Sequence, residues 1–204
     1  MGFVKGKRVP SPRKPKEVGC EALKASLDDP DAAVRRHSAQ AILHCPDAVS
    51  TLTSRLKRER DVAVREAILD SLGKVDDSDV VNGLVDCLGS DDAALRNEAI
   101  EALKQLTTDV SPALRSLLAG SDPDLRIFAV NILESRCDPG VERMLIEVIE
   151  QDLNVNVCAT AIDLLCEVGT EAALDSILRL KDRFAAEAYL QFAANLALKR
   201  IRGT

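Results

Sequence analysis

The chain has 204 residues, enough for one domain with a substantial core, and 46% of them are hydrophobic although only 2% are aromatic. The core is therefore expected to consist of Leu, Val, Ile and Ala side chains. Charged residues make up 29% of the chain, and no uncharged apolar run approaches the roughly 18 residues that a membrane span needs. We therefore expect neither a membrane-spanning protein nor a wholly disordered chain.

Residues 1–16 are predicted to form a flexible basic arm ahead of a repeat domain that covers residues 17–204. The arm has six Lys or Arg residues, no acid, and three prolines that disfavour a helix. It is interpreted either as a solvated leader or as a segment that docks on an acidic surface. The remainder has 21 basic and 33 acidic residues, a formal charge of −12, so nucleic-acid binding is not expected.

A segment that begins with Asp recurs six times, at intervals of 30 or 31 residues. These segments cover residues 31–43, 61–72, 92–103, 122–133, 152–165 and 182–196. Asp suits a helix start because its carboxylate accepts free backbone N–H groups, and the apolar spacing of three and four residues predicts one buried stripe. Shorter amphipathic segments precede them at 17–27, 48–57, 78–88, 110–118, 140–149 and 170–180. The pattern predicts an all-α stack of six helix pairs, a solenoid.

Arg follows the leading Asp by four residues in the first four segments. The pairs are Asp31 and Arg35, Asp61 and Arg65, Asp92 and Arg96, and Asp122 and Arg126. Residues four apart lie on one helix face, so each pair can meet, or the Arg can reach the Asp of the adjoining copy. We expect these residues to form a structural ladder.

The frame D-x-x-V-R-x-x-A-x-x-A-L, clearest in Asp61–Leu72, Asp92–Leu103 and Asp122–Leu133, resembles the HEAT repeat. It is most similar to the short HEAT-like repeat of the phycobilisome-lyase type. The resemblance implies a right-handed α-solenoid in which the second helix of each pair lines a concave side. Members of such families mostly bind proteins, and some attach or detach bilin chromophores, while other branches are di-iron hydroxylases or DNA glycosylases.

The residues disfavour two of these enzymatic branches. The histidines, His37 and His44, are followed by Ser38 and Cys45 and do not supply the His-Glu pairs of a di-iron centre. An acidic body without Trp disfavours the glycosylase branch. No catalytic residue, metal or cofactor is expected, although a lone metal site with His37, His44 and Cys45 stays open beside plain helix positions.

The bilin branch remains as an alternative. A linear tetrapyrrole carries propionate groups that Arg side chains can clasp, and Arg36, Arg126 and Arg136 are the candidates. Six cysteines lie within apolar helical patterns and are expected to be reduced thiols of a cytoplasmic protein. Cys158 and Cys166 are eight residues apart and are interpreted as core residues, with a metal or thioether site as the alternative.

A partner is expected to dock along the second helices. The positions expected to face the concave groove are Arg36, Glu66, Asp70, Asn97, Glu101, Ile127, Asn131 and Val157. Ile127 and Val157 would form adjacent apolar rungs of a docking patch, unless a drift in register buries them. The predicted function is a non-enzymatic scaffold or adaptor that binds a protein or peptide, and the alternative is a bilin lyase-type subunit acting on a phycobiliprotein-like partner.

The last predicted helix, over residues 182–201, contains Phe184, Tyr189 and Phe192. These aromatic residues are expected to fill the end of the core in a monomeric protein. The alternative is that they form a surface for self-association.

Overall fold

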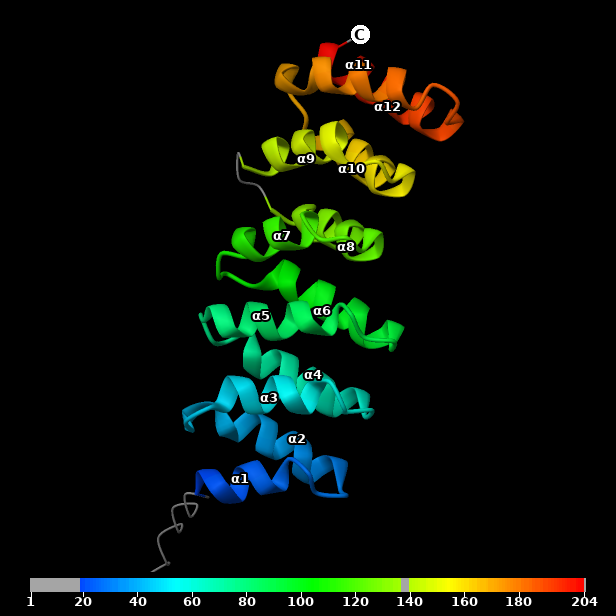
Figure 1. Cartoon of the computed structure of the whole chain (residues 1–204). Helices are drawn as coiled ribbons and strands as arrows, with labels where there is room; N and C mark the ends of the chain where they lie inside the picture. The colour runs from blue at the N-terminus through cyan, green and yellow to red at the C-terminus, as the bar shows by residue number, and fades with distance from the viewer. Residues whose placement is uncertain (1–18, 137–139, 204) are drawn as a thin grey trace, which may run out of the picture.

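The computed structural model describes residues 19–136 and 140–203, which form twelve α-helices, two short 3-10 helices and no strand. The helices stack in six antiparallel pairs along one axis, and each pair packs on the next (Figure 1). The predicted all-α solenoid of six helix pairs is thereby confirmed. The predicted arm over residues 1–16 lies outside the described residues.

Each repeat consists of a first helix and a second helix. The first helices are α1 (Cys20–Ser26), α3 (Ala48–Leu56), α5 (Ser78–Cys87), α7 (Ser111–Leu118), α9 (Gly140–Gln151) and α11 (Leu174–Arg183). The second helices are α2 (Ala32–Ala41), α4 (Val62–Leu72), α6 (Ala93–Gln105), α8 (Pro123–Leu133), α10 (Val155–Val168) and α12 (Ala188–Arg202). The 3-10 helices are η1 (Ile42–His44), which follows α2, and η2 (Glu171–Ala173), which precedes α11.

Aspartate caps the second helices of the first four repeats. The side chains of Asp31, Asp61, Asp92 and Asp122 each accept a hydrogen bond from a backbone N–H in the first turn of their helix. The frame breaks in the fifth repeat, where Asn154 caps α10 and accepts the N–H groups of Asn156 and Val157. The helix therefore begins two residues later than the Asp152 frame predicts.

The boundary predicted for the last helix is wrong. Asp182 lies in the last turn of α11, which continues to Arg183, and α12 begins at Ala188 after Glu187. Asp182 keeps the 30-residue period but does not start a helix. Arg183, the last residue of α11, donates to the carbonyls of Ile149 and Glu150 of α9, which holds this turn against the preceding repeat.

One continuous core of Leu, Val, Ile and Ala side chains runs through the stack. The fully buried residues include Val64, Leu103 and Ala129 of the predicted stripes. Helices α3 and α5 pack closely at Gly83, where an added Cβ would lie 2.3 Å from Cγ2 of Thr53. A side chain at position 83 would force the two helices apart.

The cysteines correct the expectation of six free thiols. Cys20, at the start of α1, and Cys45, directly after η1, form a disulfide with Cα atoms 5.5 Å apart. The pairing joins residues 25 positions apart, so it depends on how the first repeat folds and not on local sequence spacing. Cys87 and Cys158 are buried free thiols, and Cys166 is a half-buried free thiol.

Candidate partner-binding face

The Arg residues of the predicted ladder mostly reach across to the next repeat. Arg35 donates to both carboxylate oxygens of Glu59, at 2.8 and 3.0 Å. Arg65 donates to Asp92 at 2.9 Å, and Arg126 donates to Asp152 at 2.6 and 3.2 Å. These contacts join neighbouring repeats.

Arg96 departs from this pattern and donates to the carbonyl of Ser90 in its own repeat, at 2.6 Å. The residue two positions before the next cap differs between the repeats. Glu59 before Asp61 and Asp152 before Asn154 receive Arg35 and Arg126, whereas Gly120 before Asp122 offers no carboxylate, and Arg96 lacks the contact with the next cap that Arg65 makes with Asp92.

Glu59 is the most buried acid of these contacts, with 2% of its side chain exposed. Burial alone would raise its pKa, but hydrogen bonds from Arg35, the backbone N–H of Asp61 and Arg55 outweigh burial and hold the pKa well below its usual range. The backbone N–H of Arg60 is a fourth donor to the carboxylate, and these four partners keep the buried Glu59 ionised.

The exposed sides of the second helices form one surface, which we call the second-helix face. Five of the residues predicted for it are exposed, namely Arg36, Glu66, Asp70, Asn97 and Glu101. Ile127 and Asn131 are half-buried. These seven residues belong to four successive second helices, α2, α4, α6 and α8.

Val157 is not part of this face, and the predicted rung of Ile127 beside Val157 is wrong. The side chain of Val157 is fully buried, with 0% exposed. Because Asn154 and not Asp152 caps α10, Val157 occupies the register position that Val64 occupies in α4. Counted from the cap Asn154, Asp163 occupies the position that Asp70 occupies in α4, and its side chain is exposed as well.

An acidic groove of about 410 Å³ lies between α4 and α6 on the second-helix face. Four acids line it, Glu66, Asp70, Glu98 and Glu101, and Lys74 is the basic residue in its lining. Burial raises the pKa of Glu98, and Asp92 and Glu66 add to this effect, whereas Arg65 opposes it. With four acids and one base in its lining, the groove nevertheless presents a concentration of negative charge to solvent.

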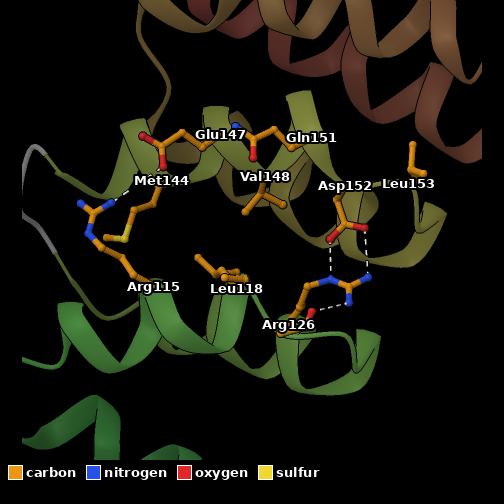
Figure 2. Close-up of a pocket in the computed structure, with 11 residues that line it drawn as sticks. Arg115, Leu118, Arg126, Met144, Glu147, Val148, Gln151, Asp152 and Leu153 are labelled. Carbon is orange, nitrogen blue, oxygen red and sulfur yellow. Dashed lines mark hydrogen bonds and ion pairs between the residues drawn. The ribbon is translucent and has the colours of Figure 1, made fainter.

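A second cavity, of about 610 Å³, lies between α7 and α9 (Figure 2). Its apolar lining comes from Leu118, Met144 and Val148. Arg115 and Arg126 lie on opposite sides of it, and Arg126 is held by Asp152. We call this cavity the Arg115–Arg126 pocket.

The three Arg residues predicted as bilin contacts do not come together. Arg36 is exposed on α2, whereas Arg126 lines the pocket beside α9. Arg136 donates to the carbonyls of Leu103 and Leu106 at the end of α6. Arg36, Arg126 and Arg136 therefore do not line one bilin-binding site.

The aromatic residues near the end of the described chain divide into two groups. Phe184 is half-buried against the core, as expected, and the guanidinium of Arg183 lies 4.8 Å from its ring centroid. Tyr189 and Phe192 do not fill the core, because they are 57% and 65% exposed. Tyr189 donates to Asp163 of α10, and Phe192 lies one helical turn further along α12.

The fold has known relatives. The HEAT repeats family model matches residues 20–104. The solved structure of an archaeal HEAT-like repeats protein from Thermococcus onnurineus NA1 superposes with a TM-score of 0.51 at 18% identity, covering 90% of this chain and 87% of that one. The chain has the fold of a HEAT-like repeat protein, as the sequence frame predicts.

Two curated proteins are similar to this HEAT-like repeat protein along most of its length. The bilin biosynthesis protein PecE of Mastigocladus laminosus is 28% identical over 81% of this chain, which spans 65% of that relative's length. The uncharacterized phycocyanin operon protein Z of Pseudanabaena tenuis is 24% identical, and the match covers 90% of this chain and 96% of that relative's length. Among the described helices, none is long and apolar enough to cross a membrane.

Sequence reasoning missed two features of this HEAT-like repeat protein. The first is Glu59, which stands two positions before the cap Asp61. Acids stand at the same offset in two other repeats, where Asp29 precedes the cap Asp31 and Asp152 precedes the cap Asn154. That recurrence is a signal readable from the sequence. The second is Arg115, whose cavity depends on the separation of α7 from α9, and no sequence signal reports that separation.

Proposed function

We propose that this HEAT-like repeat protein is a scaffold that binds a protein partner along its second-helix face. The observation that carries the proposal is the acidic groove, in which Glu66, Asp70 and Glu101, predicted as contacts from the sequence, lie together with Glu98. A preformed groove limits the entropy lost on binding. Its charge favours a partner segment rich in Lys and Arg.

Charge reversal in the groove tests this proposal. Glu66→Lys with Glu101→Lys is expected to abolish capture of a partner from extract of the source cells. Asp79→Lys with Asp182→Lys makes the same change in charge on the first helices, where both acids are exposed, and should leave capture intact. Equal capture by the two double variants would refute binding through the groove.

A bilin lyase-type subunit is the second candidate function. The name of the relative from Mastigocladus laminosus supports it, as does the Arg115–Arg126 pocket, whose apolar lining and two guanidinium groups suit a linear tetrapyrrole with propionates. The protein partner would then carry the bilin. We also propose a cytoplasmic location for either role.

Free biliverdin is a suitable probe for this second candidate. Binding in the pocket is expected to shift the visible absorption band and induce circular dichroism in it. Arg115→Ala should remove both signals, while Arg143→Ala, an exposed residue of α9 outside the pocket, should retain them. Identical spectra with and without the wild-type chain would exclude the bilin candidate and leave the scaffold proposal unaffected.

A further inference from the structure

Three metal-binding side chains converge in the first repeat, away from the second-helix face and both cavities. Cys20 is the first residue of α1, His44 is the last residue of η1, and Cys45 follows it. The Sγ atoms of the two cysteines and a ring nitrogen of His44 all lie within 4.8 Å of one another. The predicted alternative of His37, His44 and Cys45 thus has the wrong third member, because Cys20 and not His37 completes the cluster.

The backbone around the cluster is fixed by local hydrogen bonds. The carbonyl of Gly19 accepts the N–H groups of Ala22 and Leu23, which sets the start of α1. The N–H of Cys45 donates to the carbonyl of Ile42 at 2.8 Å, which ends η1. Hydrogen bonds at the helix ends therefore help to position both cysteine backbones, in addition to the bond between their sulfur atoms.

The donor set suits a borderline-soft divalent cation. Zn²⁺ binds thiolate sulfur at about 2.3 Å and imidazole nitrogen at about 2.0 Å, so neighbouring ligand atoms of a tetrahedral site lie roughly 3.5–3.8 Å apart. Small rotations of Cys20 and His44, which are half-buried and exposed, can bring the observed cluster to that spacing. Cys45 is buried and would anchor the site.

We propose that the chain, once its Cys20–Cys45 disulfide is reduced, binds one Zn²⁺ through Cys20, His44 and Cys45. A dithiol reductant supplies two electrons and two protons, which break the S–S bond and form two thiols while the reductant becomes a disulfide. Zn²⁺ then displaces both thiol protons, and water occupies the fourth position. Disulfide and metal are alternative states of the same pair of sulfur atoms.

This arrangement couples metal binding to redox conditions. An oxidised chain holds no thiolate at positions 20 and 45 and offers the metal His44 alone. A reduced chain offers all three ligands. The first repeat would therefore be cross-linked in both states, by a covalent bond in one and by the cation in the other.

Zinc competition with a chromogenic chelator tests the proposal on the full chain after reduction with a phosphine and removal of excess reagent. The reduced wild type is expected to bind one Zn²⁺ per chain, and the oxidised chain none at the same concentration. Co²⁺ in place of Zn²⁺ should give a thiolate-to-metal charge-transfer band. Absence of stoichiometric zinc from the reduced chain would overturn the proposal.

Matched variants identify the ligands. His44→Ala and Cys20→Ser are each expected to weaken zinc binding by more than about 100-fold, beyond what the loss of an outer-shell group causes. His37→Ala and Cys166→Ser, outside the cluster, should bind as the wild type does. If Cys20→Ser is unfolded by circular dichroism, the exposed His44 decides the matter, and wild-type affinity in His44→Ala would refute the three-ligand site.

Discussion

Arg35 of α2 and Glu59, which lies between α3 and α4, form a two-hydrogen-bond ion pair that joins the first repeat to the second. Only 12% of the Arg35 side chain and 2% of the Glu59 side chain are exposed. Arg55, at the end of α3, donates to the same carboxylate. One buried carboxylate thus pairs with two guanidinium groups at a boundary between repeats, and Asp28 supplies Arg55 with a second carboxylate.

Replacing this acid should be costly. Glu59→Ala is expected to lower the free energy of unfolding by about 3–5 kcal/mol, because it leaves the largely buried Arg35 without a carboxylate and Arg55 with Asp28 alone. Urea denaturation measures the change. Asp86→Ala is the control, since it removes the exposed ion pair of Asp86 with Lys57 and should cost less than about 1 kcal/mol. Similar losses in the two variants would contradict a special role for Glu59.

The same pair predicts how stability depends on pH. The folded-state pKa of Glu59 lies below its unfolded value of about 4.3, so the stabilisation is fully present above that value and is lost as the pH falls through the folded pKa. We expect the difference in stability between the wild type and Glu59→Gln to be constant above about pH 5 and to narrow in acid. Urea denaturation over that range measures it, and a difference that widens in acid would be inconsistent with a depressed pKa.

The contact between α3 and α5 predicts an unusual effect of a helix-favouring substitution. Gly83→Ala should gain up to about 1 kcal/mol in helix propensity, yet it is expected to destabilise the protein by about 1–3 kcal/mol because its Cβ would overlap Thr53. Thr53→Ala in the same chain should recover most of the loss. Thermal unfolding of both single variants and the double variant measures this coupling.

Gly73→Ala is the matched control for that experiment. A Cβ on Gly73, at the end of α4, would lie 3.4 Å from the carbonyl oxygen of Leu69, an ordinary contact. This variant should be neutral or stabilising by up to about 1 kcal/mol. Destabilisation equal to that of Gly83→Ala would mean that the overlap with Thr53 is not the cause.

The register of α10 is tested at Val157. Val157→Asp is expected to destabilise the protein by at least about 4 kcal/mol, because it buries a carboxylate among apolar side chains. Asn156→Asp introduces the same group one residue earlier, at an exposed position in the first turn, where an acid is favourable. Circular dichroism with thermal unfolding compares the two variants. A fully folded Val157→Asp chain would contradict the register that begins at Asn154 and support the one that begins at Asp152.

The exposed apolar residues of α12 allow a test between partner binding and self-association. We expect Phe192→Ser with Leu196→Ser to reduce partner capture while the mass measured by light scattering stays that of one chain. Both side chains are about half exposed or more, so folding should be retained. A wild-type mass that falls on dilution, together with a constant mass for the double variant, would assign this surface to self-association.

The sequence predicts the features that local chemistry determines. Capping by Asp61 and Asp92 depends on a carboxylate and the N–H groups of the following turn, so their spacing in the chain was sufficient to place the helices. At Asn154 an amide performs the same task, and the nearby Asp152 preserves the period, so the period alone gives the wrong register. Tertiary packing, which that period does not encode, determines the Cys20–Cys45 pair and the acidic groove.

Gly83 lies at the contact between the second and third repeats, where the first helices and the second helices pack differently. There α3 and α5 nearly touch, while α4 and α6 stand apart around the acidic groove. Between the fourth and fifth repeats the order is reversed, since α8 packs on α10 and a cavity separates α7 from α9. The size of residue 83 therefore sets how closely α3 and α5 approach, and a larger residue there would tilt one repeat against the next and change the width of the acidic groove without altering any side chain that lines it.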